Sequence, residues 1–311
     1  MVSKVSRRLV LGGAVAAGVA AAGGAVTAFA DVDGESEAKA VKLPLIGPAN
    51  GEQLHVMSFN IRTAADRGQR SWDARLPRIV TIIKAEKPTL IGTQEGKLHQ
   101  IRDLKKKLSE DYGCVYRGRE KDGSGECCAI FYRKDRIKKL NEGHRWLSPT
   151  PEAPGSIAWG AKHPRMFTWI QVQDRETGEK FYHVNTHFDH KSGTAREKSA
   201  HAIRDWMKKH DNPGIVTGDF NTGAGTRPHA TMIGGDNYHD AWNHESKRVT
   251  RSCGTANLWH PRPRWDGRRI DWIVLTKDFD VHKVGINTWV TKYDNLASDH
   301  WPVQALVSLG N

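Results

Sequence analysis

The 311-residue chain contains only four cysteines, and none of them has the Cys-x-x-Cys spacing of a metal site. After residue 30 the sequence has no apolar run long enough to span a bilayer, and it has no internal repeat or low-complexity tract. These absences exclude a cysteine-ligated metal centre, a membrane-spanning segment in the main part of the chain, and a repeat architecture. Residues 51–311 remain, and their length suits one large α/β domain.

Acidic residues are in deficit, with 35 Asp and Glu against 47 Lys and Arg, which gives a formal net charge of +12. Loss of residues 1–30 would remove Lys4, Arg7 and Arg8 and no acid, so the charge would fall to +9. A basic protein attracts polyanions such as nucleic acids, and also anionic surfaces. The charge alone fits equally well with a simpler role, which is to keep an exported protein in solution.

The N-terminus has the features of an export signal. Ser6-Arg7-Arg8-Leu9-Val10-Leu11 is a twin-arginine pattern, and an Ala/Gly/Val-rich stretch follows it. Ala28-Phe29-Ala30 then fits the small-x-small rule for signal cleavage. We therefore expect a signal peptide over 1–30 that is cleaved after Ala30, a flexible linker over 31–50, and a secreted protein; the alternative is a retained membrane anchor.

Export permits disulfide bonds. Lys121-Asp122-Gly123-Ser124-Gly125 has the composition of a hairpin loop, which would bring Cys114 near Cys127 or Cys128. Adjacent cysteines on a strand point to opposite faces, so a Cys127–Cys128 bridge would be strained. One bridge from Cys114 and four free thiols are both open at this stage.

Hydrophobic periodicity predicts three helices and ten strands in the main part of the chain. A helical stripe at Leu76, Ile79, Val80 and Ile83 stops before Pro88, and further helices are expected at 98–108 and 193–210. Strands are expected at 54–59, 89–93, 113–117, 126–133, 166–172, 181–186, 214–219, 269–276, 281–290 and 302–308. Strands from both halves with helices between them favour a four-layer αββα sandwich, in which helices flank two packed mixed β-sheets.

Two short segments carry the strongest chemical signal: Gly218-Asp219-Phe220-Asn221 and Ser298-Asp299-His300. Each follows an apolar run, so we expect it at a strand end, which is a rigid place to hold acids around a hard cation with an imidazole beside them. Such a group is suited to the hydrolysis of phosphate esters. The triplet Asp-x-Asn is common in turns, so it means little without further compatible segments.

Those further segments are present, and together they resemble the blocks of the endonuclease/exonuclease/phosphatase superfamily over about residues 53–309. The blocks are Ser58-Phe59-Asn60-Ile61-Arg62, Gln94-Glu95, Asn185-Thr186-His187-Phe188-Asp189-His190, Gly218-Asp219-Phe220-Asn221, Arg269-Ile270-Asp271-Trp272 and Ser298-Asp299-His300. The text around them, including Ala129-Ile130-Phe131-Tyr132-Arg133 and Pro164-Arg165, is similar to an exported bacterial subgroup. The resemblance is specific for fold and reaction class and unspecific for substrate.

The resemblance implies a metal site at Glu95 and Asn60, with Asp299 as a direct or water-mediated ligand. Oxygen ligands suit Mg²⁺ or Mn²⁺, with Ca²⁺ as an alternative, better than zinc. Taken alone, Glu95 would read as a solvated acid at the end of a strand.

The resemblance also assigns the proton chemistry. His300 would act as general base on the attacking water, and Asp271 would orient it and stabilise its protonated form. Asp219 and Asn221 would position the nucleophile and the phosphate oxygens. His187 would donate to a non-bridging oxygen or protonate the leaving group. The alternative for each histidine is a structural hydrogen-bonding role.

Three residues are expected to bind substrate around this centre: Arg165, His190 and Arg62. Arg165 would grip a phosphate with its guanidinium group, and the alternative is a surface salt bridge. Trp159, Trp259 and Trp265 lie in basic loops and would stack bases or sugars, although packing is the commoner role of tryptophan.

The sequence therefore predicts a secreted, divalent-metal-dependent phosphoesterase that attacks phosphodiester bonds in line with a His-activated water. Nuclease activity comes first because the chain is basic. Alternatives are a phosphatase or phospholipase C-like enzyme acting on phospholipid, inositol or sugar phosphates, and then a non-catalytic polyanion-binding protein. The expected partner is a phosphate ester, nucleic acid first, bound by a monomer without stable membrane insertion.

Overall fold

The computed structural model describes residues 41–210, 212–235 and 237–310. The expected signal peptide, its cleavage site and residues 31–40 of the expected linker lie outside these ranges. Within them, no helix is both long enough and apolar enough to cross a bilayer.

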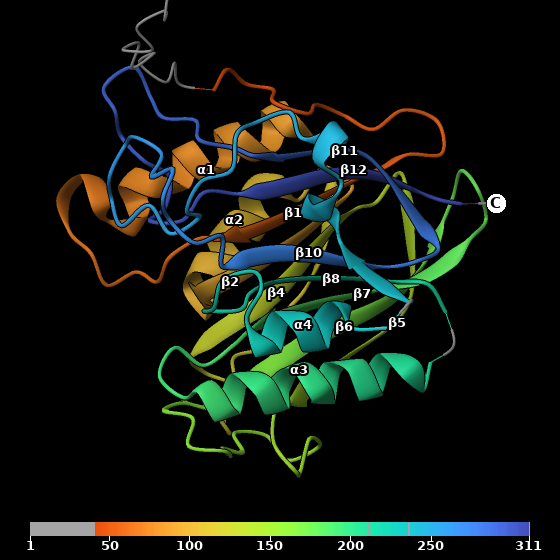
Figure 1. Ribbon diagram of the computed structural model, residues 1–311. Coiled ribbons are helices and arrows are strands. Elements are labelled where there is room, and N and C mark those ends of the chain that lie inside the picture. Colours follow the sequence, from red (N-terminus) through yellow and green to blue (C-terminus); the bar gives the residue numbers. More distant parts are fainter. Residues whose placement is uncertain (1–40, 211, 236, 311) are drawn as a thin grey trace, which may run out of the picture. The chain divides into compact units, whose positions relative to one another are not determined.

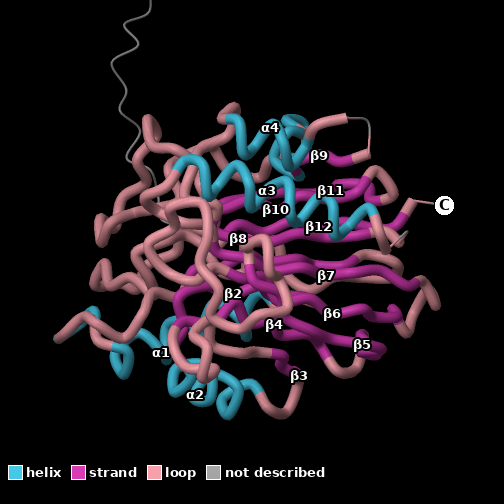
Figure 2. The backbone as a smooth tube through the Cα atoms, turned by 90° about the horizontal axis from the view of Figure 1, so that it is seen from below, coloured by secondary structure: helices cyan, strands magenta, loops and turns pink. Residues whose placement is uncertain are grey.

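The described residues form two six-stranded mixed sheets with helices outside each of them (Figures 1 and 2), as the αββα prediction requires. The first sheet has the order β11-β12-β1-β2-β4-β3 and the second β5-β6-β7-β8-β10-β9. The first contains β1 Leu54–Asn60, β2 Leu90–Lys97, β3 Tyr112–Val115, β4 Glu126–Arg133, β11 Phe279–Ile286 and β12 Val303–Leu309. The second contains β5 Ile137–Trp146, β6 Met166–Asp174, β7 Lys180–His187, β8 Gly214–Asp219, β9 Tyr238–Asp240 and β10 Asp271–Thr276.

Two helices cover each sheet (Figure 1). Helices α1 (Trp72–Glu86) and α2 (Leu98–Leu108) share an apolar cluster with the outer face of the first sheet. Helices α3 (Gly193–Lys208) and α4 (Arg227–Ile233) do so with the second. Helix α1 begins where Ser71 accepts a hydrogen bond from the Ala74 amide, and it ends at Lys87, whose left-handed φ of 48° precedes Pro88.

Strand alternation decides what lies between the sheets. In β1, Leu54 and Val56 belong to the core between the sheets, whereas Met57 and Phe59 belong to the core under the helices. Because side chains alternate, Ser58 and Asn60 follow Leu54 and Val56 onto the inner face. The same parity turns polar residues inward near one end of the other central strands: Gln94, His183, Asn185, His187, Thr217, Asp219 and Asp271.

A buried polar network joins the two sheets beneath this end. The Asn185 amide oxygen accepts from Gln94 at 2.7 Å and from the Thr217 hydroxyl at 3.1 Å. Its amide nitrogen donates to the Thr93 carbonyl at 2.8 Å. The sheets approach so closely here that a Cβ on Gly92 would lie 2.0 Å from the Thr217 hydroxyl. Only glycine fits, and the network ties the strands that carry the site into one rigid unit.

Three parts of the secondary structure differ from expectation. Strand β5 was not predicted, because it is an edge strand with a mostly exposed, polar sequence and no apolar alternation. Helix α4 and strand β9 are too short to give a periodic pattern. Strand β11 ends at Ile286, so the apolar run at 288–290 is loop.

The segment 41–50, part of the expected linker, has no helix or strand but is attached to the domain. The amides of Leu45, Ile46 and Gly47 donate to the buried Glu86 carboxylate at 2.6–3.1 Å. The Asn287 side chain donates to the same carboxylate at 2.9 Å. The four cysteines are free thiols in the structure.

Candidate active site

The sandwich brings the predicted residues to one edge. Asn60, His187 and Asp219 stand at the ends of β1, β7 and β8. Asp271 begins β10, which runs antiparallel to β8 with Asp271 opposite Asp219. Ser298-Asp299-His300 precede β12, which is antiparallel to β1. Asp219 ends β8 as expected. The expectation that Ser298-Asp299-His300 ends a strand was wrong, because these residues precede β12, but the antiparallel pairing of β12 with β1 brings them to the same edge.

Glu95 reaches this edge through an irregularity in β2. The pairing of β2 with β4 shifts between Thr93 and Gly96, which places one extra residue in β2, and Glu95 has a φ of 66°. The bulge directs Glu95 inward beside Gln94, where regular alternation would send it to the opposite face. Asn221 (φ 51°) and Arg62 (φ 56°) also have left-handed backbones, so the site holds several strained residues.

Asn60 links the carboxylates of the two sheets. Its amide nitrogen donates to Glu95 Oε1 and to Asp219 Oδ2, each at 3.0 Å. Its amide oxygen accepts from the Arg62 backbone at 3.0 Å. Asn60 thus holds two acidic groups in place, and in this orientation its oxygen faces away from them.

Arg62 lies among acidic side chains. Its guanidinium is 3.0 Å from Asp66, 3.4 Å from Asp299 and 3.7 Å from Glu95. Burial acts to lower the pKa of Arg62, but these carboxylates, Asp299 foremost, raise it above its ordinary value. Its positive charge therefore offsets the acids of the first sheet, and a role in substrate binding remains a prediction.

His300 and Asp271 form the expected pair. His300 Nδ1 is 2.9 Å from Asp271 Oδ2, and its Nε2 lies 3.8 Å from Asp219 Oδ2. Burial opposes protonation, but Asp271 and Asp219 outweigh it and raise the pKa of His300 well above its ordinary value. The Asp271 backbone is fixed by Thr255, whose hydroxyl accepts from the amides of Ile270 and Asp271 at 2.9 and 3.1 Å.

Asp219 is the carboxylate at the centre of the site. Its Oδ1 accepts a hydrogen bond from the backbone amide of Asn221 at 2.9 Å, and its Oδ2 lies 3.6 Å from His187 Nε2. Burial and the neighbouring Asp271 raise the pKa of Asp219 to about 7, while His300 opposes the shift. Acidic side chains are thus packed more closely here than their mutual repulsion favours.

His187 is held as a neutral imidazole. The Asn221 amide nitrogen donates to the Phe188 carbonyl at 3.0 Å and to His187 Nε2 at 2.9 Å, which leaves the hydrogen of His187 on Nδ1. Burial, with Arg165 and Arg119 nearby, lowers the pKa of His187 well below its ordinary value. A neutral imidazole favours donation to a non-bridging oxygen over protonation of a leaving group.

The donor set fits a hard divalent cation. Single ligand atoms of Glu95, His187 and Asp219 lie within 4.8 Å of one another, and so do those of Asp219, Asp271 and His300. Burial also raises the pKa of Asp299, with Glu95 adding to the shift. A bound cation would relieve this accumulation of negative charge, and carboxylate oxygens are the ligands that Mg²⁺ and Mn²⁺ prefer. Glu95 and Asp219 could hold it, and Asp299 lies nearby, 3.4 Å from the Arg62 guanidinium that also faces Glu95.

The remaining predicted residues lie around this centre. Arg165 is buried beside His187, and its Nη2 donates to His190 Nδ1 at 3.1 Å. Trp259 is partly buried, with Arg70 5.2 Å from its ring centroid, and Trp159 packs against the core under α3. Trp265 is 40% exposed, with Arg251 4.8 Å from its ring. Packing thus accounts for two of the three tryptophans.

Sequence reasoning missed Arg75 as well as Thr255. Arg75 is fully buried, and its guanidinium donates to the carbonyls of Ile61, Arg62 and Thr63 after β1 and to that of Ala297 before Asp299. It thus holds two site loops together. A signal was available, because Arg75 precedes Ile79 by four residues and so falls on the apolar face of the predicted helix.

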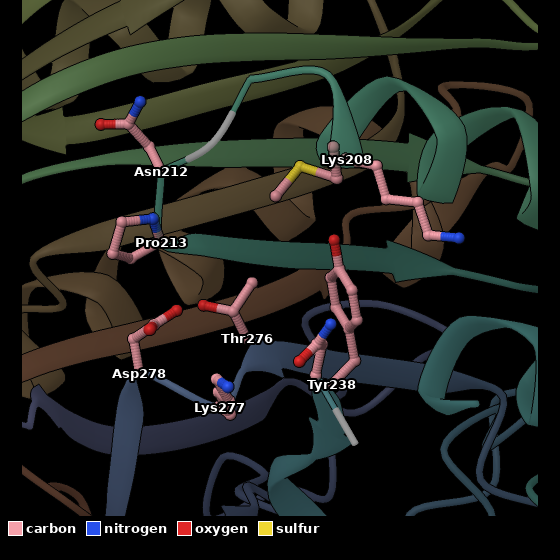
Figure 3. Close-up of a pocket in the computed structure, with 9 residues that line it drawn as sticks. Lys208, Asn212, Pro213, Tyr238, Thr276, Lys277 and Asp278 are labelled. Atoms are coloured by element: carbon pink, nitrogen blue, oxygen red, sulfur yellow. The ribbon is translucent and has the colours of Figure 1, made fainter. Parts of the chain in front are cut away.

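A hollow of about 350 Å³ lies at the opposite end of β8 and β10 (Figure 3). Its lining includes Lys208, Tyr238, Thr276 and Lys277. None of the predicted site residues lines it. This hollow therefore does not coincide with the cluster of charged side chains, which lies at the other end of these strands and is the candidate site.

The class that this fold and this cluster define is the metal-dependent phosphoesterases of the αββα type. Comparison with known proteins identifies the family: the model of the Endonuclease/Exonuclease/phosphatase family matches residues 57–300, and the chain belongs to this family.

Solved structures agree. An endonuclease/exonuclease/phosphatase from Bacteroides vulgatus is 31% identical, with a TM-score of 0.77, covering 83% of this chain and 99% of its own. The mannosyl-6-phosphatase of Bacteroides thetaiotaomicron VPI-5482 is 31% identical, with a TM-score of 0.75, covering 82% and 100%. A curated relative, the uncharacterized protein L388 of Acanthamoeba polyphaga mimivirus, is 30% identical over 168 residues, 49% of this chain. The chain spans 59% of that relative's length.

Proposed function

We propose that the protein is an exported phosphatase that uses a divalent cation to hydrolyse phosphomonoesters of sugars or similar polar alcohols. The observation that carries the reaction class is the His300–Asp271 pair, at 2.9 Å, beside the carboxylates of Asp219, Glu95 and Asp299. This arrangement places a base that can activate water next to carboxylates that can hold a cation, and the cation would bind the phosphate.

His300 serves as the base. Because Nδ1–H donates to Asp271, Nε2 is free to take a proton from the attacking water, and Asp271 then stabilises the imidazolium. Asp219 lies 3.8 Å from Nε2 and orients the water between them. Asp219 and Asp299 are among the carboxylates that raise the pKa of His300, so a cation bound by them would lower this pKa toward the range in which a base works.

The other polar groups hold the phosphate. Neutral His187, whose tautomer Asn221 fixes, would donate its ring N–H to a non-bridging oxygen. A Mg²⁺ or Mn²⁺ ion held by Glu95, Asp219 and Asp299 would supply positive charge to the phosphate oxygens. Water oxygen forms the new P–O bond, the ester P–O bond breaks, and the alcohol leaves with a proton taken from solvent water.

The substrate class is supported by a relative. The mannosyl-6-phosphatase is 31% identical over 82% of this chain, which favours a phosphate on a sugar hydroxyl. The twin-arginine pattern at 6–11 supports export, where such a substrate would be met outside the cell.

A nuclease is the second candidate, and the observation that favours it is the formal charge of +12, or +9 without residues 1–30. Such an excess of basic residues attracts polynucleotides. The net charge does not indicate which type of phosphate ester is cleaved, so it carries less weight than the similarity to the mannosyl-6-phosphatase.

The test is a substrate panel with purified protein: mannose 6-phosphate, p-nitrophenyl phosphate, bis(p-nitrophenyl) phosphate, single-stranded DNA and RNA, each with Mg²⁺, Mn²⁺, Ca²⁺ or EDTA. We expect release of inorganic phosphate from the two monoesters that stops in EDTA. Cleavage of only the diester and the polynucleotides would replace the proposal by the second candidate. Turnover of none of them by folded, metal-supplied protein would refute both.

A further inference from the structure

A groove of about 650 Å³ opens beside the candidate active site. Its walls include the loop 223–226 after β8, residues 268–269 before β10, and the side chains of Trp242 and Arg248. This volume lies in the range of small-molecule sites in proteins. None of the residues with a role in the proposed reaction lines the groove, so it is a feature separate from the catalytic cluster.

The groove is continuous with the two strands that carry the central acids of the site. Strands β8 and β10 are paired as far as Asp219 and Asp271, and the Phe220 amide then donates to the Ile270 carbonyl at 2.9 Å. The segments next to this contact form the groove walls. Arg269 Nη1, on one wall, lies 3.5 Å from the Asp271 carbonyl. The groove therefore begins beside the residue that orients His300.

The groove is positively charged. Arg248, Arg268 and Arg269 line it, and no Asp or Glu of the described residues does. Arg269 is buried and is paired with the buried Asp240. Arg248 is 3.1 Å from Glu245, whose side chain is 87% exposed, so solvent weakens this pair. Arg268 is exposed and is paired with no acid in the described part of the chain. Arg248 and Arg268 thus offer charge to a ligand.

Arg248 is held in place by its surroundings. Its Nε donates to the Trp242 carbonyl at 2.9 Å, and its guanidinium lies 5.3 Å from the centroid of the Trp242 ring. Its backbone forms a β-bridge with Val284 of β11. Trp242 is buried in turn, and its amide donates to Asp240 at 2.9 Å. A guanidinium fixed in this way loses little conformational freedom when it binds an anion.

The groups on the walls suit a phosphate. A guanidinium binds two phosphate oxygens at once through parallel hydrogen bonds, and these charge-assisted bonds are stronger than neutral ones. The Ser252 hydroxyl and the Asn243 amide add further donors at exposed positions of the same groove. Phosphate is therefore the ligand chemistry that the groove favours.

We infer that this groove binds a second phosphate, carried by the alcohol part of the substrate, and that sugar bisphosphates are turned over in preference to sugar monophosphates. The catalytic cluster holds the phosphate that is cleaved, and the groove beside Asp271 holds the other one. The inference rests on the proposed function and adds a specificity site to it. The neighbouring phosphate of a polynucleotide has the same chemistry, and the experiment separates these two sources.

The experiment compares mannose 1,6-bisphosphate with mannose 6-phosphate, which differ by one phosphate. Wild type should have the higher kcat/KM for the bisphosphate. Arg268→Gln and Arg248→Gln should each lower that value roughly 10-fold, the lower end for loss of a hydrogen bond to a charged group, and lower that for the monophosphate less than about threefold. The loss should appear in KM, because the second phosphate does not react. KM for the bisphosphate should also rise more steeply with ionic strength.

A matched variant controls for loss of surface charge in general. Arg264 is an arginine of the same loop as Arg268, with a 49% exposed side chain, and it does not line the groove. Arg264→Gln should leave the ratio of the two kcat/KM values as in wild type. Arg268→Lys, which keeps the charge but not the paired hydrogen bonds, should retain part of the preference. Circular dichroism should show the fold retained in each variant.

A second pair of substrates tests the source of the phosphate. Thymidine 5′-phosphate and the dinucleotide pTpT differ by one nucleotide and its phosphodiester. A preference for pTpT that falls in Arg268→Gln, without a preference between the two mannose phosphates, would assign the groove to polynucleotides and overturn the inference.

Equal turnover of the two mannose phosphates by wild type, or an equal fall for both in Arg268→Gln and Arg248→Gln, would also overturn the inference, while the phosphatase would stand. Absence of turnover with every monoester tested, by folded and metal-supplied protein, would instead refute the proposed function and the inference with it.

Discussion

The two sheets have the same internal plan but carry different chemistry. Each has a central parallel pair, β1–β2 in the first and β8–β7 in the second. Antiparallel strands flank both pairs: β12 and β4 in the first sheet, β10 and β6 in the second. Asn60 at the end of β1 corresponds to Asp219 at the end of β8, and Gln94, which precedes Glu95 in β2, corresponds to His187 in β7.

The comparison shows how the work is divided. The first sheet and its loops supply Asn60, Glu95, Asp299 and the base His300, whereas the second supplies His187, Asp219 and Asp271. The Asn60–Asp219 hydrogen bond, at 3.0 Å, joins the equivalent positions across the space between the sheets. The base His300 precedes β12 of the first sheet, whereas Asp271, which orients it, and Asp219 come from the second, so the complete site requires both sheets.

The largest effect is expected from groups on which both sheets depend. Asp219→Ala and His300→Ala should each lower kcat by about 10²–10⁴-fold, the worth of a positioned acid–base group. Steady-state kinetics at saturating Mg²⁺ checks this, and far-UV circular dichroism should show the fold retained. Near-normal turnover in either variant would remove that residue from the mechanism.

Glu95→Gln tests whether the first sheet serves the cation. The Mg²⁺ concentration for half-maximal activity should rise about 10- to 100-fold, because the change removes a ligand charge without changing shape. Glu142→Gln, in the exposed edge strand β5, is the control and should titrate as wild type. An unchanged titration for Glu95→Gln would contradict its ligand role.

The raised pKa of Asp219 predicts how the metal-free protein responds to pH. The folded pKa is about 7 and the ordinary value is 3.8, so the folded state holds a proton that the unfolded state has lost between these values. Stability without metal should therefore fall as pH rises from about 4 to 7, by on the order of 1–3 kcal/mol. Thermal unfolding in EDTA at pH 5 and pH 8 measures this fall.

Asp219→Asn is the matching variant for that measurement. It should be more stable than wild type at pH 8 in EDTA and should lose the pH dependence that comes from this group. A wild-type protein as stable at pH 8 as at pH 5, or a variant with the same pH profile, would show that Asp219 is not strained by its neighbours.

The smallest expected effect concerns an anchor outside the site. Glu86→Gln replaces a buried carboxylate that accepts from three backbone amides and Asn287, so the free energy of unfolding should fall by about 1–2 kcal/mol. Activity per folded molecule should stay unchanged. Urea denaturation and kinetics test the two halves of this statement; a loss of kcat would mean that segment 41–50 supports the site.

The sequence was sufficient for most of the fold, because strand alternation is a local property, and the blocks that resemble the superfamily named a set of residues that the fold brings together. Asn60, Glu95, His187, Asp219, Asp271, Asp299 and His300 all meet at one edge. It was insufficient where an answer depends on a partner far along the chain. The orientation of the Asn60 amide depends on Asp219, and the role of Arg75 depends on two loops of the first sheet, one after β1 and one before β12.

The sequence also failed to predict a strand at the edge of a sheet. Strand β5 is exposed along most of its length, so nothing forces its sequence to alternate. Its identity comes from pairing with β6, which starts only twenty residues later in the chain. A lone strand pattern could not reveal that partner.

The extra residue in β2 has a consequence for reading other members of the family. Without the extra residue, the Glu95 side chain would point toward α1 and α2. The first sheet would still form, but the cation site would lack this carboxylate. A homologue whose second strand is one residue shorter at this point should therefore fold normally and yet be inert toward phosphate esters, so the length of this strand can separate hydrolases from folded non-enzymes before any assay is run.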